Sequence, residues 1–482
     1  MQSRWPSDSP GLFRRLLVPA LAASLVLPTT IASAQEPAPA PTAEPAPAPA
    51  PVEAAPAAPA PEPVAAPEPV SVSATTTFEG PSPVPVHGSP TVEGEQPAEY
   101  KTPEIVEEPA DTGSITIGGW IEAYYAHNFN NPQNHTTANR WVDEKTDSFT
   151  LQTFALDISA QKGPFSAMVT LMFGPTADRW YFEGSQIPSQ ALPQVLDANG
   201  YSNETFKNVM TAYGGYKAPV GKGLLIEAGL LPTQVGYETT PVKNNFNFSR
   251  SNLFNFLPFF HLGARATYPL TDNLTVTAGV FNGWNQLIDR NIKKSVSLQT
   301  SYSNDDWLFN LLYFGGAERS TRPGNWWSDK DLEDGSKSGM PWRNMFDAVA
   351  QYTGIPNLIL AAELNGGWEA QKQATQKWVG AGLWAQLKLT DWLFVAGRGD
   401  GIAEGGTGNW ANGRFITIGD GHIVSGTGTL ELRPLGDGFS FRVEYRHDST
   451  NKDNELVGFY KGRNNTFVNS QNTVNVGVTG WF

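Results

Sequence analysis

Hydrophobic and polar residues alternate along most of the chain after Ser114. Successive side chains of a β-strand point to opposite faces, so a period of two predicts strands with one apolar and one polar face. The clearest alternating segments are Ile115–Tyr125, Phe165–Phe173, Phe260–Tyr268, Leu274–Val280, Val379–Leu387, Phe441–Tyr445 and Val474–Val478. This pattern favours an all-β fold.

The connections between the expected strands alternate in length. Short turns are expected at Lys162–Pro164, Pro219–Gly223, Thr271–Asn273, Asn304–Asp306, Gly354–Asn357, Thr390–Asp391 and Pro434–Gly438. Long polar loops are expected near residues 127–147, 174–205, 233–257, 285–293, 317–342, 367–376, 402–415 and 449–466. These connections predict about 16 strands, and the uncertainty of strand boundaries allows roughly 14–18.

Short turns on one side and long loops on the other are typical of outer-membrane barrels. Closing the sheet pairs every strand edge, which lipid requires because it offers no hydrogen bonds to the backbone. We therefore predict a transmembrane antiparallel β-barrel over residues 112–482. An even number of strands places both ends of this segment on the periplasmic, short-turn side.

A soluble secreted β-sandwich or propeller is the alternative fold, because its strands would alternate as well. Aromatic residues at the ends of the strands favour the membrane, where they gather at both interfaces. Those near short turns or the chain end are Trp307, Trp392, Phe439 and Trp481, and those near long loops are Trp284, Trp342, Trp368 and Trp378.

The N-terminal region differs in composition from the rest of the chain. Residues 1–34 predict a signal peptide, because an Arg pair precedes an apolar run and an A-x-A cleavage site. Residues 35–111 hold 20 of the 38 prolines, which predicts a disordered Pro/Ala/Glu-rich periplasmic tether. This tether is either a solvated spacer or a strap that reaches the cell wall. The two segments carry net charges of +2 and −12, which leaves only −4 of the total of −14 for residues 112–482.

Several kinds of chemistry are disfavoured. The chain has no cysteine and no basic patch, which excludes disulfides and Cys-ligated metals and argues against nucleic acid as a partner. The segment Asp329–Gly335 resembles a calcium loop, but Met340 stands where a bidentate Glu is needed. The six histidines lie in no local catalytic motif. We expect no metal, no cofactor and no enzymatic activity.

Four sequence blocks resemble a known family. They are GWIEAYYAHNFNNP at residues 119–132, SFTL at 148–151, PVGKGLLIEAGLLPTQVGYE, and SRSNLFNFLPFFHLGARATYPLTDNLTVTAGVFNGWNQLIDRN. Together they resemble the OmpL-like β-barrel porins of bacterial outer membranes, over roughly residues 114–482. The resemblance implies an outer-membrane barrel with pore activity, and it implies no catalytic residues and no particular solute.

Charged residues on the strands indicate the face that lines the lumen, because Arg facing lipid at the midplane costs ~2–4 kcal/mol. The candidate pore-lining residues are Glu122, Asp157, Glu227, Arg265, Arg398, Asp400, Arg442, Glu444 and Arg446. Asp347, Glu363, Glu431 and Arg433 are expected on the same face. Both signs occur, so these charges predict either modest ion selection or a salt-bridge network in a filled lumen.

The third long loop is a candidate constriction. It carries Glu238, Lys243 and Arg250 together with several phenylalanines, which indicate packing against another part of the protein. In general porins one loop folds into the barrel and narrows it, and a similar order of loops suggests the same arrangement here. The alternative is a solvated surface loop.

The last residues predict how the barrel closes. The final strand is expected to pair with the first near Ile115–Tyr125, with its valines toward lipid. A terminal Phe after alternating apolar residues resembles the sorting signal of the barrel-assembly machinery, so Trp481 and Phe482 are candidate assembly residues. Deletion of Phe482 should impair assembly before it changes permeation.

These observations predict a porin that lets small hydrophilic solutes or ions diffuse through a water-filled lumen. The alternative is a plugged structural barrel that anchors the envelope through residues 35–111. The expected partners are outer-membrane lipid, the assembly machinery and the solutes. The cell wall is a candidate partner of the tether, and general porins suggest a homotrimer.

Overall fold

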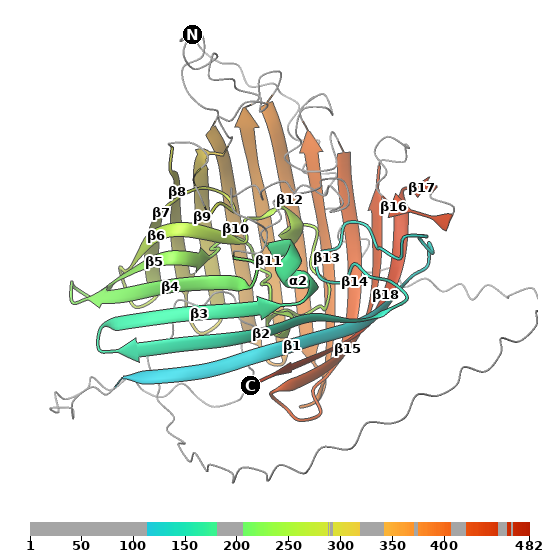
Figure 1. Ribbon diagram of the computed structural model, residues 1–482, viewed down its shortest axis with the longest axis horizontal. Coiled ribbons are helices and arrows are strands. Elements are labelled where there is room, and N and C mark those ends of the chain that lie inside the picture. Colours follow the sequence, from blue (N-terminus) through green and yellow to red (C-terminus); the bar gives the residue numbers. More distant parts are fainter. Residues whose placement is uncertain are drawn as a thin grey trace, which may run out of the picture. The chain divides into compact units, whose positions relative to one another are not determined.

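The barrel segment forms one closed antiparallel sheet of sixteen strands, in the order β1-β18-β15-β14 and then down the chain to β2 (Figure 1). This computed structural model describes residues 113–180, 206–287, 289, 293–318, 342–370, 375–405, 421–451, 460–463 and 466–482. The predicted fold class and strand number are confirmed. The predicted signal peptide and tether, and the segment Asp329–Gly335, lie outside the described residues.

The sixteen barrel strands match the alternating segments of the sequence. They are β1 Ser114–Asn128, β2 Phe149–Lys162, β3 Phe165–Phe173, β4 Val209–Ala218, β5 Leu224–Pro232, β6 Phe260–Pro269, β7 Leu274–Phe281, β8 Ser295–Ser303, β9 Trp307–Ala317, β10 Trp342–Ile355, β11 Leu358–Ala370, β12 Thr375–Lys388, β13 Leu393–Gly405, β14 Gly421–Leu432, β15 Phe439–Thr450 and β18 Ser470–Trp481. Strand β13 continues to Gly405, farther than the expected loop start at residue 402.

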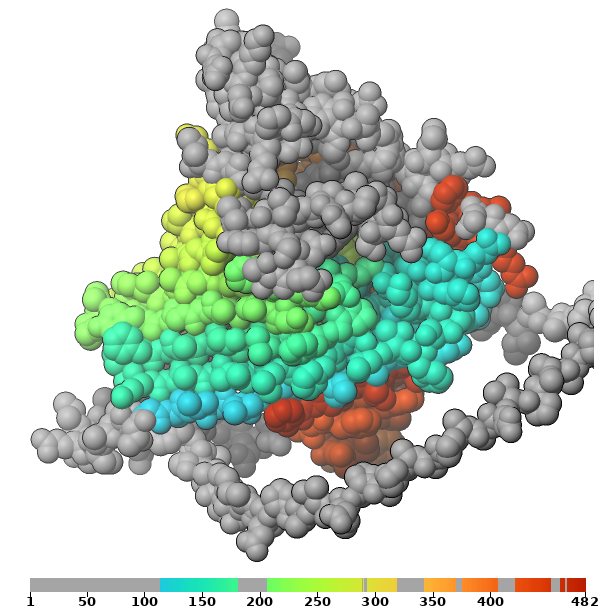
Figure 2. All heavy atoms as spheres, in the orientation of Figure 1, coloured from blue at the N-terminus to red at the C-terminus, as the bar shows by residue number. Residues whose placement is uncertain are grey.

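The two faces of the sheet carry the predicted chemistry. Outward positions of β1 such as Ile115 and Ile117 are 74% and 60% exposed. The inward residues Glu122 and Asn128 of the same strand are each 1% exposed. Figure 2 shows the outer side chains of β1 to β5 as a continuous surface in blue to green. The outer face is therefore apolar and accessible, and the polar face is buried inside the barrel.

The first and last strands close the barrel as predicted, with a small displacement along the strands. Strand β1 pairs with β18 from Trp120, opposite Trp481, to Asn128, opposite Thr473. The paired stretch of β1, Trp120–Asn128, is therefore displaced by a few residues toward the long loops relative to the predicted Ile115–Tyr125. The valines of β18 point outward, and Asn475 and Thr479 are buried on the inner side.

The long connections contain short elements that the alternation did not predict. They are the helix α2 at Pro175–Trp180, the 3₁₀ turns η1 at Val242–Asn244 and η2 at Phe254–Phe256, and the two-stranded sheet of β16 Tyr460–Lys461 with β17 Phe467–Val468. Within the described ranges, none of the helices is long and apolar enough to cross a membrane.

The predicted aromatic belts are correct for some residues and wrong for others. Trp307, Trp342 and Trp368 are between 39% and 43% exposed on the outer face. Trp284 and Trp378 are instead 9% and 4% exposed, in an apolar cluster inside the barrel. Trp378 precedes an outward valine, so the strand alternation itself places it inward.

Candidate functional site

The connection between β5 and β6 folds into the barrel. We call residues 233–259 the inserted loop; it includes η1 and η2 and appears in yellow-green between the walls of the barrel in Figure 1. Its Thr233 N–H donates to the Phe259 carbonyl, which joins its two ends. Hydrogen bonds connect it to the inner faces of strands on both sides of the β1–β18 seam.

Carboxylates of the barrel wall bind the main chain of the inserted loop. Glu122 on β1 accepts from the Val242 N–H at 2.7 Å. Glu444 on β15 accepts from two successive N–H groups, those of Phe248 at 2.7 Å and Ser249 at 3.1 Å. Hydrogen bonds from backbone N–H groups to ionised acceptors are among the stronger ones in proteins.

Further carboxylates extend this pattern along the loop. Asp347 and Glu363, on β10 and β11, accept from the N–H groups of Gly236 and Tyr237 at 3.0 and 2.9 Å. Asp400 on β13 accepts from the Asn252 N–H at 2.7 Å. The loop is therefore held from its first residues to its second half.

Arginines of the same wall bind the carbonyl groups of the loop. Arg442 donates to the Val242 carbonyl at 2.8 Å, and Arg398 donates to the Ser249 carbonyl at 2.6 Å. Arg446 donates to the Arg250 carbonyl. Val242 thus gives its N–H to a wall carboxylate and accepts from a wall guanidinium. We call these wall carboxylates and arginines the main-chain clamp.

The charged residues of the inserted loop occupy different environments. Glu238 pairs with Arg398 at 2.9 Å and accepts from the Ser251 N–H at 2.6 Å. Burial alone would raise the pKa of Glu238, but the guanidinium groups of Arg398 and Arg250 lower it below its ordinary value. Arg250 is 2% exposed. Lys243 is partly exposed, with its Nζ 5.3 Å from the centre of the Trp120 ring.

The guanidinium of Arg250 links different parts of the inserted loop to one another. It donates to the carbonyls of Thr239 and Phe248 at 2.8 and 2.7 Å, and to that of Thr240. These carbonyls come from both halves of the loop. Arg250, proposed from the sequence as a constriction residue, is therefore placed as an internal brace.

Aromatic residues of the loop pack against the barrel wall, as their abundance in the sequence indicated. Tyr237 and Phe246 join a buried cluster with wall residues that include Trp384. The Tyr237 ring lies 5.0 Å from that of Trp384. On the other side, Phe248 lies against Gly477 of β18, where a Cβ would collide with its ring.

Three of the predicted lumen charges lie on β2, β5 and β6 and do not belong to the main-chain clamp. Arg265 on β6 and Glu227 on β5 form an ion pair of 2.7 Å. Asp157 on β2 accepts from the Thr170 hydroxyl of β3 at 2.6 Å. Asp157 and Arg265 are half-buried, whereas the six charges on β1, β13 and β15 are 2% exposed or less. The structure therefore divides the predicted set into clamp residues and a second group on the inner faces of β2 to β6, which we call the free wall.

The first long loop and α2 also fill space at the loop end of the barrel. Trp141 and Trp180 join a buried cluster with Phe254 and Phe259 of the inserted loop. Arg140 in the first loop donates to Asp448 of β15 at 2.9 Å. The sequence analysis did not identify these contacts, because nothing in a local pattern joins three separate loops.

Trp481 and Phe482 lie on opposite faces of the sheet at the β1–β18 seam. Trp481 lies on the inner side and donates from Nε1 to Asp437 at 2.8 Å. Phe482 is 75% exposed on the outer side, and its N–H donates to the Gly119 carbonyl at 3.2 Å. Their predicted role in assembly stays a prediction.

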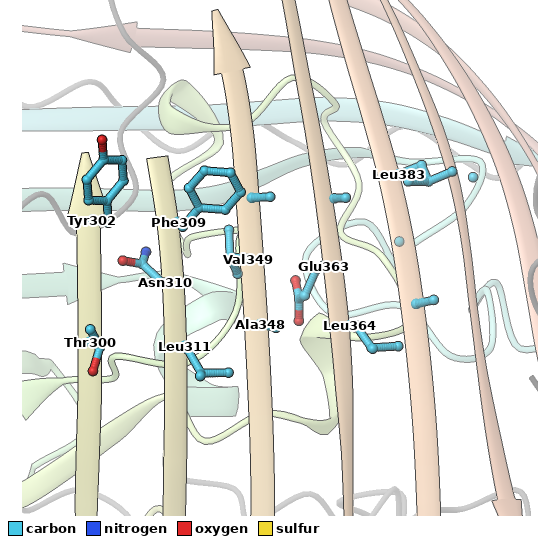
Figure 3. A pocket seen from close by; sticks show the side chains of 15 residues that line it. Thr300, Tyr302, Phe309, Asn310, Leu311, Ala348, Val349, Glu363, Leu364 and Leu383 are labelled. Carbon is cyan, nitrogen blue, oxygen red and sulfur yellow. The ribbon is translucent and has the colours of Figure 1, made fainter. Parts of the chain in front are cut away.

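The outer face carries an apolar groove of about 570 Å³ over β8 to β13. Figure 3 shows Leu311, Leu364 and Leu383 among the side chains that line it, with Ala348 between Leu311 and Leu364. Leu311 is 61% exposed, which places the groove on the lipid side of the wall. The groove is therefore separate from the lumen.

Metal chemistry has no visible site in the described part of the chain. There, no group of three or more His, Asp or Glu residues has an arrangement that could hold a metal ion. The charged side chains of the lumen instead bond to one another and to the main chain.

The barrel, its inserted loop and its lumen charges agree with the match to a family model. Residues 114–482 match the family "Putative beta-barrel porin-2, OmpL-like". The chain belongs to this family. The resemblance seen in the sequence is confirmed, and membership places this OmpL-like porin in the outer membrane. A search of curated protein sequences gives no significant match.

Solved outer-membrane barrels are similar to this OmpL-like porin. OmpT of Vibrio cholerae matches with a TM-score of 0.47 and 11% identity, over 79% of this chain and 100% of that chain. An anion-selective porin from Comamonas acidovorans matches with a TM-score of 0.46 and 11% identity, over 77% of this chain and 100% of that chain. The outer membrane channel DcaP of Acinetobacter baumannii matches with a TM-score of 0.47 and 8% identity, over 77% and 97%.

Proposed function

We propose that this OmpL-like porin lets small hydrophilic solutes or ions diffuse passively across the outer membrane. The main-chain clamp is the observation that carries the proposal. It keeps the inserted loop against the strands around β10 to β15 and β1, so that the loop narrows the lumen without moving freely in it. A narrowed, polar lumen is how porins select solutes.

The permeation path that we propose runs beside the free wall, along the inner faces of β2 to β6, because β8 is hydrogen-bonded to Gln234 of the inserted loop. Asp157, Glu227 and Arg265 would contribute its charges, and Lys243 would contribute from the loop. Glu227 and Arg265 compensate each other through their 2.7 Å ion pair. Because both signs of charge occur on the lumen face, we expect weak selectivity between cations and anions.

Conductance in planar bilayers tests this proposal. The full chain, purified in detergent and folded as shown by heat-modifiable mobility, is expected to give steady stepwise currents. A salt gradient then gives the ratio of cation to anion permeability from the reversal potential. Silence over many verified insertions would reject the channel.

A plugged structural barrel is the second candidate. The buried aromatic cluster that joins Trp141, Trp180 and Phe259 favours it, because this cluster fills the loop end of the lumen. In this case residues 35–111 would anchor the envelope from the periplasm. Bilayer recording separates the two candidates, because a plugged barrel stays silent. Deletion of residues 35–111 tests the tether: envelope leakiness favours anchoring, and an unchanged envelope favours a spacer. The assembly machinery and a homotrimer stay predictions.

A further inference from the structure

The alternation of β18 does not by itself define one register against β1. The outward residues of β18 are valines at three successive outward positions, Val474, Val476 and Val478. A slip of two residues would leave every side chain of β18 on its present face, because the side-chain period of a strand is two. Another feature must select the register at which the barrel closes.

Two reciprocal pairs on the outer face distinguish the observed register. Gly119 lies opposite Phe482, and their main chains exchange two hydrogen bonds of 3.2 Å. A Cβ on Gly119 would lie 3.2 Å from the Phe482 ring, so the ring covers the space that this glycine leaves open. Next to this pair, Ile121 lies opposite Gly480, and a Cβ on Gly480 would lie 3.3 Å from the Ile121 side chain.

The neighbouring registers lose this complementarity. After a slip of two residues in one direction, Ile121 would face Val478 and Gly119 would face Gly480. After a slip in the other direction, Ile121 would face Phe482. Neither shifted register places Phe482 opposite Gly119, and the first leaves Gly119 and Gly480 facing each other with no side chain between them. Both therefore lose the ring that covers Gly119, and an aromatic side chain across from a glycine stabilises a sheet by such packing.

The other edge of β18 is fixed by polar contacts. Asn472 accepts from the Tyr445 hydroxyl at 2.7 Å and from Nδ1 of His447 at 2.8 Å, which joins β18 to β15 at one height. The seam between β1 and β18 has side-chain polar contacts only at its loop end among the described residues, where Asn128 Nδ2 donates to Gln471 Oε1 at 3.3 Å and Asn130 Nδ2 donates to the Ser470 carbonyl at 2.8 Å. At the other end of the seam, near Gly119 and Ile121, the register depends on packing.

We propose that Gly119–Phe482 and Ile121–Gly480 form a register key that selects the alignment of β1 with β18 when the barrel closes. In this role Phe482 acts inside the folded barrel, which is distinct from its predicted recognition during assembly. The inference does not depend on transport.

Disulfide trapping tests the register key, because the chain contains no cysteine of its own. Ala123→Cys with Val478→Cys reports the observed register, in which these residues are opposite. Ala123→Cys with Val476→Cys, and Tyr125→Cys with Val478→Cys, report the two shifted registers. Diagonal neighbours lie ~7–8 Å apart, beyond the usual reach of a disulfide. Only barrels with heat-modifiable mobility, refolded from urea into detergent, are counted.

The native key is expected to give mainly the Ala123–Val478 cross-link. Phe482→Ala and Gly480→Ile should each increase the shifted cross-links several-fold, whereas Val474→Ala, an outward change away from the key, should not. The exchange Ile121→Gly with Gly480→Ile restores complementarity and should restore the observed register. Folded Phe482→Ala and Gly480→Ile barrels that give only the Ala123–Val478 cross-link would overturn the proposal. If Phe482→Ala does not fold, the Gly480→Ile variant and its exchange partner decide.

Discussion

Arg398 on β13 and Glu238 in the inserted loop form an ion pair of 2.9 Å in which both side chains are almost fully buried. Removal of one partner of such a pair leaves a charge in a site that water does not reach, which costs about 3–5 kcal/mol. This contact joins the loop to the wall opposite its own two strands. It therefore gives a direct way to test how tightly the loop is docked.

Substitution Glu238→Ala should loosen the inserted loop while the barrel stays folded. Loss of this carboxylate removes the partner of Arg398 and the acceptor of the Ser251 N–H. Amide hydrogen exchange of the loop should accelerate about a hundredfold or more, since 1.4 kcal/mol corresponds to a factor of ten. Asp391→Ala, in an exposed turn, is the control. Unchanged exchange at Ser251 would mean that the pair does not hold the loop.

Substitution Glu444→Ala should expose the loop to protease. Glu444 accepts from the N–H groups of Phe248 and Ser249, next to Arg250, which is only 2% exposed. Limited trypsin digestion of the folded barrel should cut the peptide bond after Arg250 in the variant and leave this bond intact in the native protein. Asp157→Asn on the free wall is the matched control, in which the bond after Arg250 should also stay intact. Equal resistance of both variants would argue against the main-chain clamp.

Charge changes on the free wall should alter ion selectivity. Arg265→Gln leaves Glu227 without its guanidinium partner, so the permeation path becomes more negative. The reversal potential in a salt gradient should therefore shift toward cation preference. Lys222→Gln changes a charge of the same sign in a turn and should leave the potential unchanged. A shift of equal size in both variants would place the path elsewhere.

Acid should release the inserted loop through Glu238. The pKa of this loop carboxyl is lowered in the folded state by Arg398 and Arg250, against the effect of burial. A lowered folded pKa means that the stabilisation is complete above the ordinary value of about 4.3 and is lost as the pH falls through the folded value. Current noise in bilayers should rise only in that acid range. Glu238→Gln should show no such transition, and a transition near neutral pH would contradict this assignment.

Charge on the outer face should destabilise the barrel in lipid. Leu311 is 61% exposed beside the apolar groove, and Arg at the membrane midplane costs ~2–4 kcal/mol. Leu311→Arg should reduce the free energy of unfolding in vesicles by this amount. Leu435→Arg lies in a turn, where Leu435 is 77% exposed, and should have little effect. Equal stability of the two variants would mean that position 311 does not face lipid.

Local pattern predicted the strands because each one must show lipid an apolar face. The same constraint identified the face on which Arg442 and Glu444 lie. The sequence did not reveal that their partners are backbone groups of the inserted loop. Val242 and Phe248 are about 200 residues away, and a main-chain N–H or carbonyl has no signature in the sequence.

The tryptophans show a second limit. Trp284 and Trp378 were expected at the membrane interface because they lie near long loops, but they pack inside the barrel. A wide barrel that contains folded loops has an apolar core of its own. An aromatic residue near a loop can therefore lie either at the membrane interface or in this inner core. Strand phase separates the two for Trp378, and no strand phase exists for Trp284.

The main-chain clamp adds to the side-chain docking of the inserted loop a set of contacts that do not depend on side-chain identity. Val242, Phe248 and Ser249 are bound in part through main-chain groups that every residue except proline carries. The loop side chains that face the free wall can therefore change during evolution or engineering without loss of docking. The same barrel and clamp would then admit different solutes, depending on the side chains at a few positions of the inserted loop.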